Sequence, residues 1–173
     1  MAGKPAIFFG FEKMTIKKFS TIFDGLEEAF GTFEIQKQNA NGKSTGQARI
    51  VREERTPDHW KGHLSGKGPS VGIIAINSEN NCKWGCIDID QYNLDHKELI
   101  KKIRDLKLPL IVCRSKSGGG HIFIFCKDWI SAKDLQQVLR HIASALGYSD
   151  CEIFPKQIKL QLDRGDVGNF LNM

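Results

Sequence analysis

The segment from Trp84 to Asp90 constrains the fold of this chain most strongly. It reads Trp-Gly-Cys-Ile-Asp-Ile-Asp, an apolar run that two acids, Asp88 and Asp90, interrupt near its end. Side chains alternate along a strand, so the segment is predicted to be a strand with both carboxylates on one face. Carboxylates placed together repel each other unless a cation lies between them. The pattern therefore predicts a divalent metal site of the kind that acts on phosphates.

The second half of the chain has the pattern of a βαββαβ unit, which is ferredoxin-like or RRM-like. Hydrophobic periodicity and capping residues predict four strands and two helices there. The strands are expected at 84–90, 110–114, 121–126 and 150–154, and the helices at 95–106 and 131–146. Such a unit has an antiparallel sheet in the order fourth, first, third, second strand, with both helices on one face. We therefore expect an α/β (α+β) fold in which this unit follows a smaller N-terminal α/β subdomain.

The predicted topology brings several polar residues to one edge of this sheet. The end of the first strand and the starts of the third and fourth strands meet at that edge. Apolar alternates such as Ile87, Ile122 and Ile153 are expected to face the helices. The opposite, open face should then carry the other alternates, which are Asp88, Asp90, His121, Phe123, Asp150 and Glu152.

The first half of the chain gives weaker signals. A short helix is expected at 24–30 and a second at 56–64, where Thr56 is the cap and Pro57 takes the first helical position. Strands are expected at 32–38, 47–51 and 71–76, with a turn at 39–43. We treat 1–173 as a single catalytic domain, with an N-terminal subdomain over about 1–80 and the RRM-like subdomain over about 81–173.

Composition narrows the class of protein. The net charge is +5 with a pI of about 9.0, and residues 36–70 hold seven Lys or Arg against three acids. This balance favours a polyanionic partner. No apolar run approaches the ~20 residues of a membrane span, and the first residues lack a signal peptide. We therefore expect a cytoplasmic protein without a membrane partner.

The five cysteines argue for a reduced interior. Four of them lie in or beside apolar strand-like runs, where cysteine is a small core residue. Cys82 and Cys86 are not followed by a second pair at zinc spacing, so a structural zinc is not expected.

The turn at 114–121, Arg-Ser-Lys-Ser-Gly-Gly-Gly-His, suits a triphosphate. Glycines let backbone N–H groups approach phosphate oxygens closely. Lys116, Ser117 and His121 would add donors. The turn is not a Walker A loop, because no Gly-Lys-Ser/Thr opens a helix after it.

Three segments together resemble the archaeo-eukaryotic primase superfamily, and the primase-polymerases of phages, plasmids and bacterial mobile or defence systems in particular. They are Ile-Asp-Ile-Asp at 87–90, Ser-Gly-Gly-Gly-His-Ile-Phe-Ile-Phe at 117–125 and Glu-Ile-Phe-Pro-Lys-Gln at 152–157. Trp60-x-x-His63-Leu-x-Gly66 and Gly168-Asn169 extend the resemblance over most of the chain. It implies a template-directed nucleotidyltransferase, a DNA primase or polymerase. Such an enzyme transfers nucleotides from NTP or dNTP to a 3′-hydroxyl on single-stranded DNA template and primer.

The resemblance also implies roles for individual residues. Asp88, Asp90 and Glu152 would hold one or two Mg²⁺ or Mn²⁺ ions, with Asp150 as the alternate third acid. His121 would contact the phosphates of the incoming nucleotide. The family has a serine two residues before this histidine, but Gly119 stands there, so the role of that serine would move to Ser117 or Ser115 or be lost.

Two further groups of residues complete the expected site. The nucleotide pocket would comprise Ser115, Lys116, Ser117, Gly119, Gly120, His121, Lys156, Gln157 and Asn169. Template backbone would lie on the basic N-terminal half, at Arg49, Arg52, Lys61, His63 and Lys67.

Family members usually continue beyond the Gly-Asn stretch, whereas this chain stops within an apolar segment. We therefore expect a truncated catalytic core of a longer protein, in which a helicase or accessory domain could be a partner.

Other functions remain open from the residues alone. The main alternative is a non-catalytic RRM-like module that binds single-stranded nucleic acid, with Phe123 and Phe125 on the open face stacking bases. A replication-initiator nuclease would need a His-x-His pair and a tyrosine nucleophile, and only His121 is present. A nucleotide cyclase of the same topology is opposed by the Gly-Gly-Gly-His turn and the Phe-Pro-Lys-Gln segment.

Overall fold

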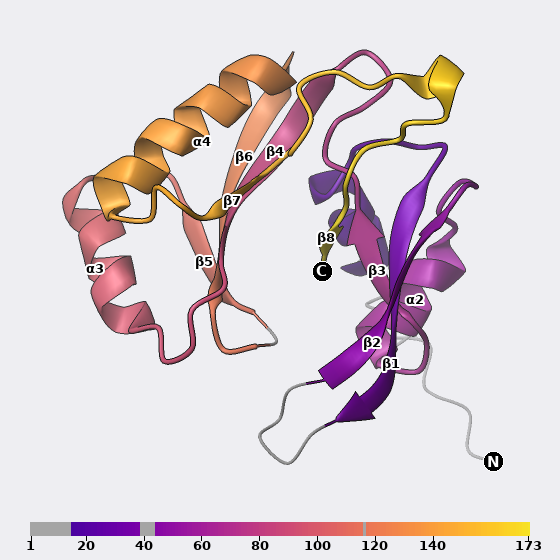
Figure 1. Cartoon of the computed structure of the whole chain (residues 1–173), viewed down its shortest axis with the longest axis horizontal. Coiled ribbons are helices and arrows are strands. Elements are labelled where there is room, and N and C mark those ends of the chain that lie inside the picture. The colour runs from indigo at the N-terminus through magenta and orange to yellow at the C-terminus, as the bar shows by residue number, and fades with distance from the viewer. Residues whose placement is uncertain (1–14, 39–43, 116) are drawn as a thin grey trace.

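The chain folds into two four-stranded antiparallel sheets with helices packed around them (Figure 1). The computed structural model describes residues 15–38, 44–115 and 117–173. The first sheet has the strand order β2-β1-β3-β8 and the second the order β5-β6-β4-β7. The mixed α/β class predicted from the sequence is confirmed.

The first sheet comes mainly from the N-terminal half. It contains β1 (Phe30–Gln38), β2 (Ser44–Val51), β3 (Ser70–Ile73) and β8 (Leu171–Asn172), and α2 (Pro57–Ser65) lies between β2 and β3 along the chain. The predicted β1–β2 hairpin is present, although its turn at 39–43 lies outside the described residues. The helix predicted at 56–64 is confirmed with Thr56 as its cap. Strand β8 was not predicted.

The second sheet is built as the sequence predicted. Its elements are β4 (Asn81–Ile89), α3 (His96–Asp105), β5 (Ile111–Arg114), β6 (Gly120–Ser131), α4 (Ala132–Leu146) and β7 (Glu152–Phe154). Read from β7, the sheet has the order fourth, first, third, second strand, all antiparallel.

Local signals explain why the two helices begin and end where they do. The Asp95 carboxylate accepts the backbone N–H groups of Lys97 and Glu98 at 2.9 and 3.0 Å, which satisfies donors that would otherwise be unpaired at the start of α3. Helix α4 ends at Gly147, whose φ of 86° is the left-handed conformation that glycine adopts without strain.

One hydrophobic core lies between the second sheet and these helices. The sheet contributes the alternating residues that were predicted to face the helices, including Ile87, Ile122 and Ile153. The helices contribute their buried apolar stripes, which are Leu99, Ile103, Leu135, Leu139, Ala143 and Leu146. These stripes recur at the 3.6-residue period of an amphipathic helix.

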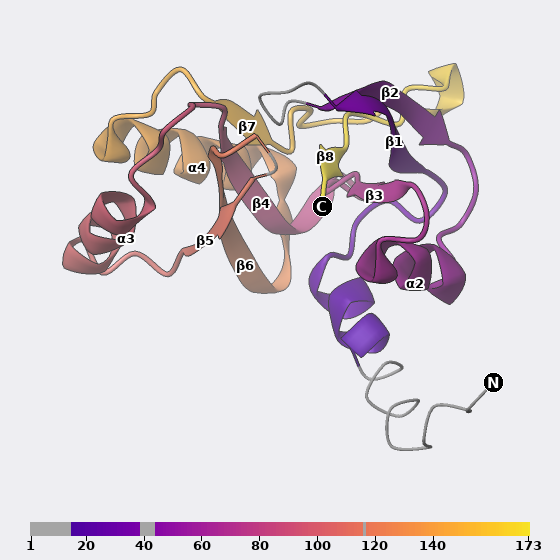
Figure 2. The ribbon, with the colours of Figure 1, turned by 90° about the horizontal axis from the view of Figure 1, so that it is seen from below.

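A second core lies on the other face of the same sheet. Figure 2 shows α3 and α4 on one side of β4 and β6, and the first sheet with α2 on the other. Trp84, Cys86 and Phe123 pack there against first-sheet residues such as Phe30 and Ile73. The second sheet is therefore an inner layer over much of its length.

This second core corrects the prediction for the aromatic residues of β6. Phe123 is only 4% exposed, and Phe125 is half-buried, with its ring centroid 5.5 Å from that of Phe23. The prediction that both rings lie on an open face was wrong, because it considered the βαββαβ unit without the N-terminal part that covers it. The base-stacking platform needed by a non-catalytic RRM-like module is thus closed.

The helix expected at 24–30 is also absent; the helical residues of this region are 15–22 instead. The N–H of Leu26 donates to the Ile74 carbonyl at 3.0 Å, and the Trp84 indole N–H donates to the Asp24 carbonyl at 2.7 Å. These long-range bonds satisfy backbone groups that a helix would pair locally. The strand expected at 71–76 is also shorter than predicted: β3 stops at Ile73, and the carbonyl of the next residue, Ile74, is the one that accepts the Leu26 N–H.

The structure agrees with the expected reduced cysteines and contains no membrane-spanning helix among the described residues. All five cysteines are free thiols, and Cys82 and Cys86 are buried. Burial raises the pKa of Cys82 to about 12. Within the described ranges, every helix is too short or too polar to cross a bilayer.

Candidate active site

A row of four residues crosses the second sheet, one from each strand. Cys113 of β5 lies opposite His121 of β6, His121 opposite Asp88 of β4, and Asp88 opposite Glu152 of β7. Directly opposed residues of antiparallel strands share one face. Because Ile87 lies in the core beneath the helices, the row lies on the other face, beyond the aromatic second core. The structure thus places Asp88, His121 and Glu152 side by side.

Asp88 and His121 form the central contact of the row. The Nε2 atom of His121 lies 3.4 Å from Oδ1 of Asp88, and the two side chains are 16% and 24% exposed. Burial raises the pKa of Asp88; His121 opposes that rise, and the nearby Glu152 and Asp90 carboxylates add to it. Burial lowers the pKa of His121, and Asp88 opposes this. Burial is thus the main reason that the charged form of Asp88 is disfavoured, and Lys156, like His121, opposes the rise in its pKa.

Glu152 lies at the exposed end of the row. Its Oε1 atom pairs with the Nζ atom of Lys156 at 2.7 Å. The side-chain amide of Gln136 on α4 donates to the carbonyls of Pro155 and Lys156, both at 2.9 Å, which fixes this segment against the helix. Asp150, the alternate third acid, is exposed in the turn before β7 and is not opposite Asp88.

The glycine-rich turn approaches Asp90. Within the turn, the Ser115 N–H donates to the Gly119 carbonyl at 2.9 Å, and the Gly118 N–H donates to the Ser115 carbonyl at 3.1 Å. The Ser117 hydroxyl donates to Oδ1 of Asp90 at 3.2 Å, and the hydroxyls of Ser115 and Ser117 are 3.1 Å apart. Both serines are thus connected to the second aspartate. Lys116, also predicted for this site, lies outside the described residues.

Gly119 stands where the family resemblance led us to expect serine, and the structure gives a steric reason. The residue is buried, and a Cβ atom added to it would lie 2.0 Å from the carbonyl oxygen of Ile89. No side chain fits there without a shift of the β4 backbone. Ser117, two residues earlier, is the serine whose hydroxyl donates to Asp90. Gly120, the first residue of β6, is also buried.

Two other predicted residues form a reciprocal pair. The Gln157 side-chain amide donates to the Asn169 side-chain oxygen, and the Asn169 backbone N–H donates to Oε1 of Gln157 at 2.9 Å. This pair joins the segment after β7 to the segment before β8. It fixes the chain where it returns from the second sheet to the first.

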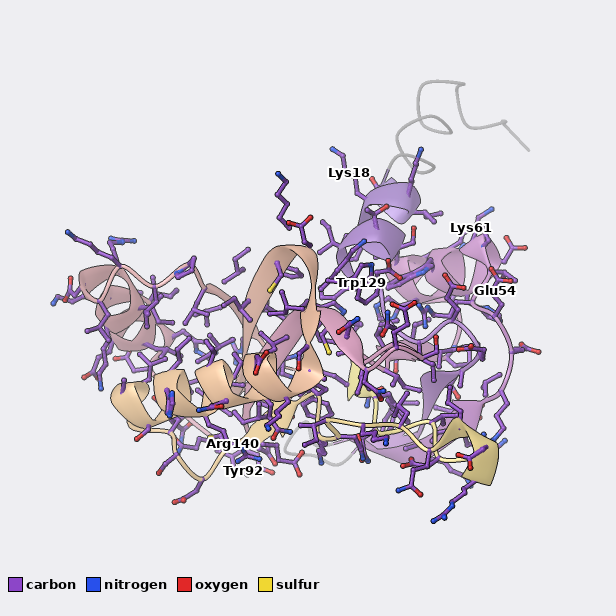
Figure 3. All side chains as sticks on the ribbon, turned by 90° about the horizontal axis from the view of Figure 1, so that it is seen from above. Lys18, Glu54, Lys61, Tyr92, Trp129 and Arg140 are labelled. Carbon is purple, nitrogen blue, oxygen red and sulfur yellow. The ribbon has the colours of Figure 1, made fainter. Side chains whose placement is uncertain are left out.

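The basic residues predicted to hold template lie on the first-sheet half. Arg49 donates to Gln47 at 2.7 Å, and Arg52 donates to the Gly165 carbonyl at 2.7 Å. Lys61 and Lys67 are exposed. Figure 3 shows Lys61 on the outer surface at the α2 end of the molecule, away from α4.

His63 differs from these basic residues in its surroundings. It is half-buried, and its Nδ1 atom accepts the Val71 backbone N–H at 3.2 Å. Burial lowers the pKa of His63. The arrangement is that of a neutral histidine that supports the start of β3.

Sequence reasoning missed His96 and Cys113. The Nε2 atom of His96, in the first turn of α3, lies 3.0 Å from the Gly119 carbonyl oxygen. Cys113 is exposed and completes the four-residue row. Neither residue belongs to a motif; the only available signal was their position near the edge at which the predicted strands and helix meet.

The donor set fits a hard divalent cation. Among the described residues, no group of three or more His, Cys, Asp or Glu side chains is already arranged around a common metal position. The carboxylates of Asp88, Asp90 and Glu152 are nevertheless oxygen donors on adjacent strands, and Mg²⁺ and Mn²⁺ prefer such donors. The exposed Glu152 side chain would have to exchange its pairing with Lys156 for a metal ion held with Asp88.

The fold and this site define a class of protein in which acidic residues and a histidine lie together at one edge of an α/β sheet. A family model described as "TOTE conflict system, Archaeo-Eukaryotic Primase domain" matches residues 14–173. The chain belongs to this archaeo-eukaryotic primase family, as the sequence motifs predicted. A comparison with curated proteins found no match.

Proposed function

We propose that the chain is a template-directed nucleotidyltransferase, a DNA primase or DNA polymerase. It would transfer nucleotides from NTP or dNTP to a 3′-hydroxyl. Family membership supports this class of reaction. The observation that carries the proposal is the register of Asp88 between His121 and Glu152, with Asp90 bonded to Ser117 beside them. The unit that presents these residues is RRM-like in its βαββαβ order.

Asp88, Asp90 and Glu152 would hold one or two Mg²⁺ or Mn²⁺ ions, with Asp150 as the alternate third acid. When bound, such ions neutralise the negative charge that develops on phosphate oxygens during transfer. The raised pKa of Asp88 supports this assignment, because its burial beside two further acids disfavours the charged state when no cation is present. In this reading His121 also limits the repulsion at Asp88.

The glycine-rich turn and its neighbours would bind the triphosphate. The hydroxyls of Ser115 and Ser117 and the imidazole of His121 surround the acidic pair on the side of the turn. Hydroxyl and N–H donors suit phosphate oxygens. The remaining proposed contacts to the nucleotide are Lys116, Gly119, Gly120, Lys156, Gln157 and Asn169.

Single-stranded template and primer would bind by their backbone to Arg49, Arg52, Lys61 and Lys67 on the first-sheet half. Such contacts are independent of base sequence and weaken as salt increases. His63 would support this surface indirectly, since its ring nitrogen is used by Val71. The proposed setting is the cytoplasm, with a helicase or accessory domain as a partner.

De novo synthesis and primer extension on single-stranded DNA, with labelled NTPs and dNTPs and with Mg²⁺ or Mn²⁺, test the proposal. Asp88→Asn and Asp90→Asn should each reduce the rate by about 100-fold or more, a typical loss when charge stabilisation at a reacting centre is removed. Asp128→Asn, an exposed position on β6, is the matched control and should retain full activity.

Two results would contradict the proposal. Full activity of both Asp88→Asn and Asp90→Asn would exclude the acidic pair from the reaction. Binding of single-stranded DNA that ignores EDTA and is strengthened by Asp88→Asn, without any synthesis, would instead identify the chain as a non-catalytic binding module.

A further inference from the structure

We propose that His96 is a positioning residue for the glycine-rich turn. Through its hydrogen bond to the Gly119 carbonyl, it would hold the turn in the shape that receives the nucleotide phosphates. The inference rests on the proposed function in assigning phosphates to the turn. The contact itself is independent of that assignment, because it is present in the structure.

The geometry of the contact fixes which atom carries the proton. The Nε2 atom of His96 lies 3.0 Å from the Gly119 carbonyl oxygen. A carbonyl oxygen only accepts hydrogen bonds, so Nε2 must be protonated and donate. The same oxygen accepts the Ser115 N–H at 2.9 Å. Two donors from different elements, one on α3 and one at the end of β5, thus converge on one carbonyl.

A hydrogen bond to the Gly119 carbonyl should restrict the turn strongly, because Gly119 is already closely packed. The Cα atom of Gly119 is already packed against the Ile89 carbonyl at the end of β4, where no Cβ would fit. Because Gly119 packs against Ile89 and its carbonyl is bonded to His96, the peptide that follows Gly119 should have little freedom to rotate. That peptide leads directly into Gly120 and His121 of β6, so its orientation also affects the central Asp88–His121 contact.

The effect should extend to the serines through their hydrogen bonds. Ser115 is held to Gly119 by its backbone N–H, its hydroxyl lies 3.1 Å from that of Ser117, and Ser117 donates to Asp90 at 3.2 Å. Loss of the His96 bond would therefore loosen one end of a chain of bonds that ends at the proposed metal-binding acid.

Helix α3 is a rigid support for this role. Asp95 caps its first turn with two hydrogen bonds, and Leu99 and Ile103 anchor the helix in the core. Leu94, just before the cap, packs close to Gly120, since a Cβ added there would lie 2.9 Å from a Leu94 methyl carbon. A side chain fixed on such an element can position a loop that has few contacts of its own.

The test compares His96→Met with His96→Gln. Methionine keeps a side chain of similar length but cannot donate, whereas the amide nitrogen of glutamine can replace Nε2. The loss of one positioning hydrogen bond should raise the KM for the incoming nucleotide about five- to tenfold in His96→Met. We expect kcat to change by less than about twofold, and His96→Gln to restore KM to within about twofold of the wild-type value. His141→Met, on the exposed face of α4, should change neither constant.

Amide hydrogen exchange supplies a readout that does not need activity. The Ser115 and Gly118 amides should exchange faster in His96→Met than in the wild type or His96→Gln, because both are bonded within the turn. If the wild-type protein transfers no nucleotide, the proposed function fails while this measurement still tests the positioning role.

Three results would overturn the inference. They are an unchanged KM in His96→Met of an active protein, a His96→Gln variant as impaired as His96→Met, and unchanged exchange at both amides. If thermal unfolding shows that His96→Met does not fold, His96→Asn replaces it. Asparagine is polar but one methylene shorter than glutamine, and it should show the same defects because its amide does not reach the carbonyl.

Discussion

At the scale of single residues, Asp88 is subject to two opposing influences. Its position in the middle of the row gives it a histidine neighbour that favours the carboxylate. Burial and two further acids favour the neutral acid, and burial is the largest of these effects on its pKa. An acid in such a place gains little for the stability of the protein itself. The proposed metal ion would supply the positive charge that favours its carboxylate form.

Gly119→Ala should damage the site without touching any polar group. The added methyl would meet the Ile89 carbonyl at 2.0 Å, so β4 or the turn must move. We expect a loss of about 1–3 kcal/mol in the free energy of unfolding, as for other overpacked sites, together with at least about a tenfold loss of nucleotide transfer. Urea denaturation and primer extension measure the two effects.

Gly62→Ala is the control for this substitution. A Cβ at Gly62 in α2 would have no neighbour nearer than 3.9 Å. Gly62→Ala should raise the free energy of unfolding by about 0.5–1 kcal/mol, because alanine has a higher helix propensity than glycine. Equal effects of the two substitutions would show that the steric account of Gly119 is wrong.

His63 should make stability depend on pH. Burial lowers its pKa in the folded protein below the ordinary 6.5, so the unfolded chain binds the proton more readily. The stability that this group contributes is fully present above pH 6.5 and decreases as the pH falls from 6.5 toward the lowered folded value. Below that value the loss is complete.

Comparison with His63→Asn isolates this contribution. The asparagine side-chain oxygen can accept the Val71 N–H but does not titrate in this range. The free energy of unfolding of both proteins is measured by urea denaturation from pH 7.5 to 5. Below pH 6.5, the wild type should lose stability relative to His63→Asn. A difference that stays constant over this range would remove His63 as the cause.

At the scale of elements, α4 holds the second sheet from one side through an apolar stripe. Leu139, at its centre, is 0% exposed, whereas Val138, the neighbouring residue, is 46% exposed. Leu139→Ala should cost about 2–5 kcal/mol, the range for large-to-small changes in a core. Val138→Ala should change stability by less than about 0.5 kcal/mol. Thermal or urea unfolding of both variants tests the assignment of the buried face, and similar costs would contradict it.

Elements with strong local signals were predicted well from the sequence. The apolar period of α4, the end of that helix at Gly147 and the alternation along β4 all depend on interactions within a few residues. The helix expected at 24–30 failed for the opposite reason. Its backbone is bonded to Ile74 and Trp84, residues that are distant in sequence.

The residues of the candidate site likewise include some that the sequence predicted and some that it did not. Asp88, His121 and Glu152 could be placed together because each strand's period is two and the topology fixed the order of the strands. His96 could not be placed, because its contact with Gly119 depends on the exact angle at which α3 leaves β4. Strand β8, with two residues, has too short a pattern to be recognised at all.

At the scale of the whole molecule, the face of the second sheet that lies away from its helices has two parts with different surroundings. Part of the face away from the helices is covered by the first sheet and α2, and the remainder carries the acidic row. The aromatic residues Trp84 and Phe123 lie in the covered part. Because these residues belong to the same strands as Asp88 and His121, the packing of the N-terminal half against them also helps to hold those strands in place.

Phe123→Ala should therefore act on stability and not on base recognition. The ring is 4% exposed, so its removal should cost about 3–5 kcal/mol. Ile111→Ala on β5, at a side chain that is 55% exposed, is the control and should change stability by less than about 0.5 kcal/mol.

The affinity of the folded Phe123→Ala variant for single-stranded DNA, measured by fluorescence anisotropy, should stay within about twofold of the wild-type value, since a stacked base would contribute about 1–3 kcal/mol. A tenfold loss of affinity with little loss of stability would restore the stacking hypothesis.

The pairing of β8 with β3 also determines the order in which the molecule can be completed during synthesis. Ribosomes release β1, β2 and β3 first, but the strand that pairs along β3 emerges only after the whole second sheet has been made. One edge of β3 therefore stays unpaired until the second half of the chain and β8 have been synthesised. Translation can begin the first sheet early, but the two halves have to finish folding together.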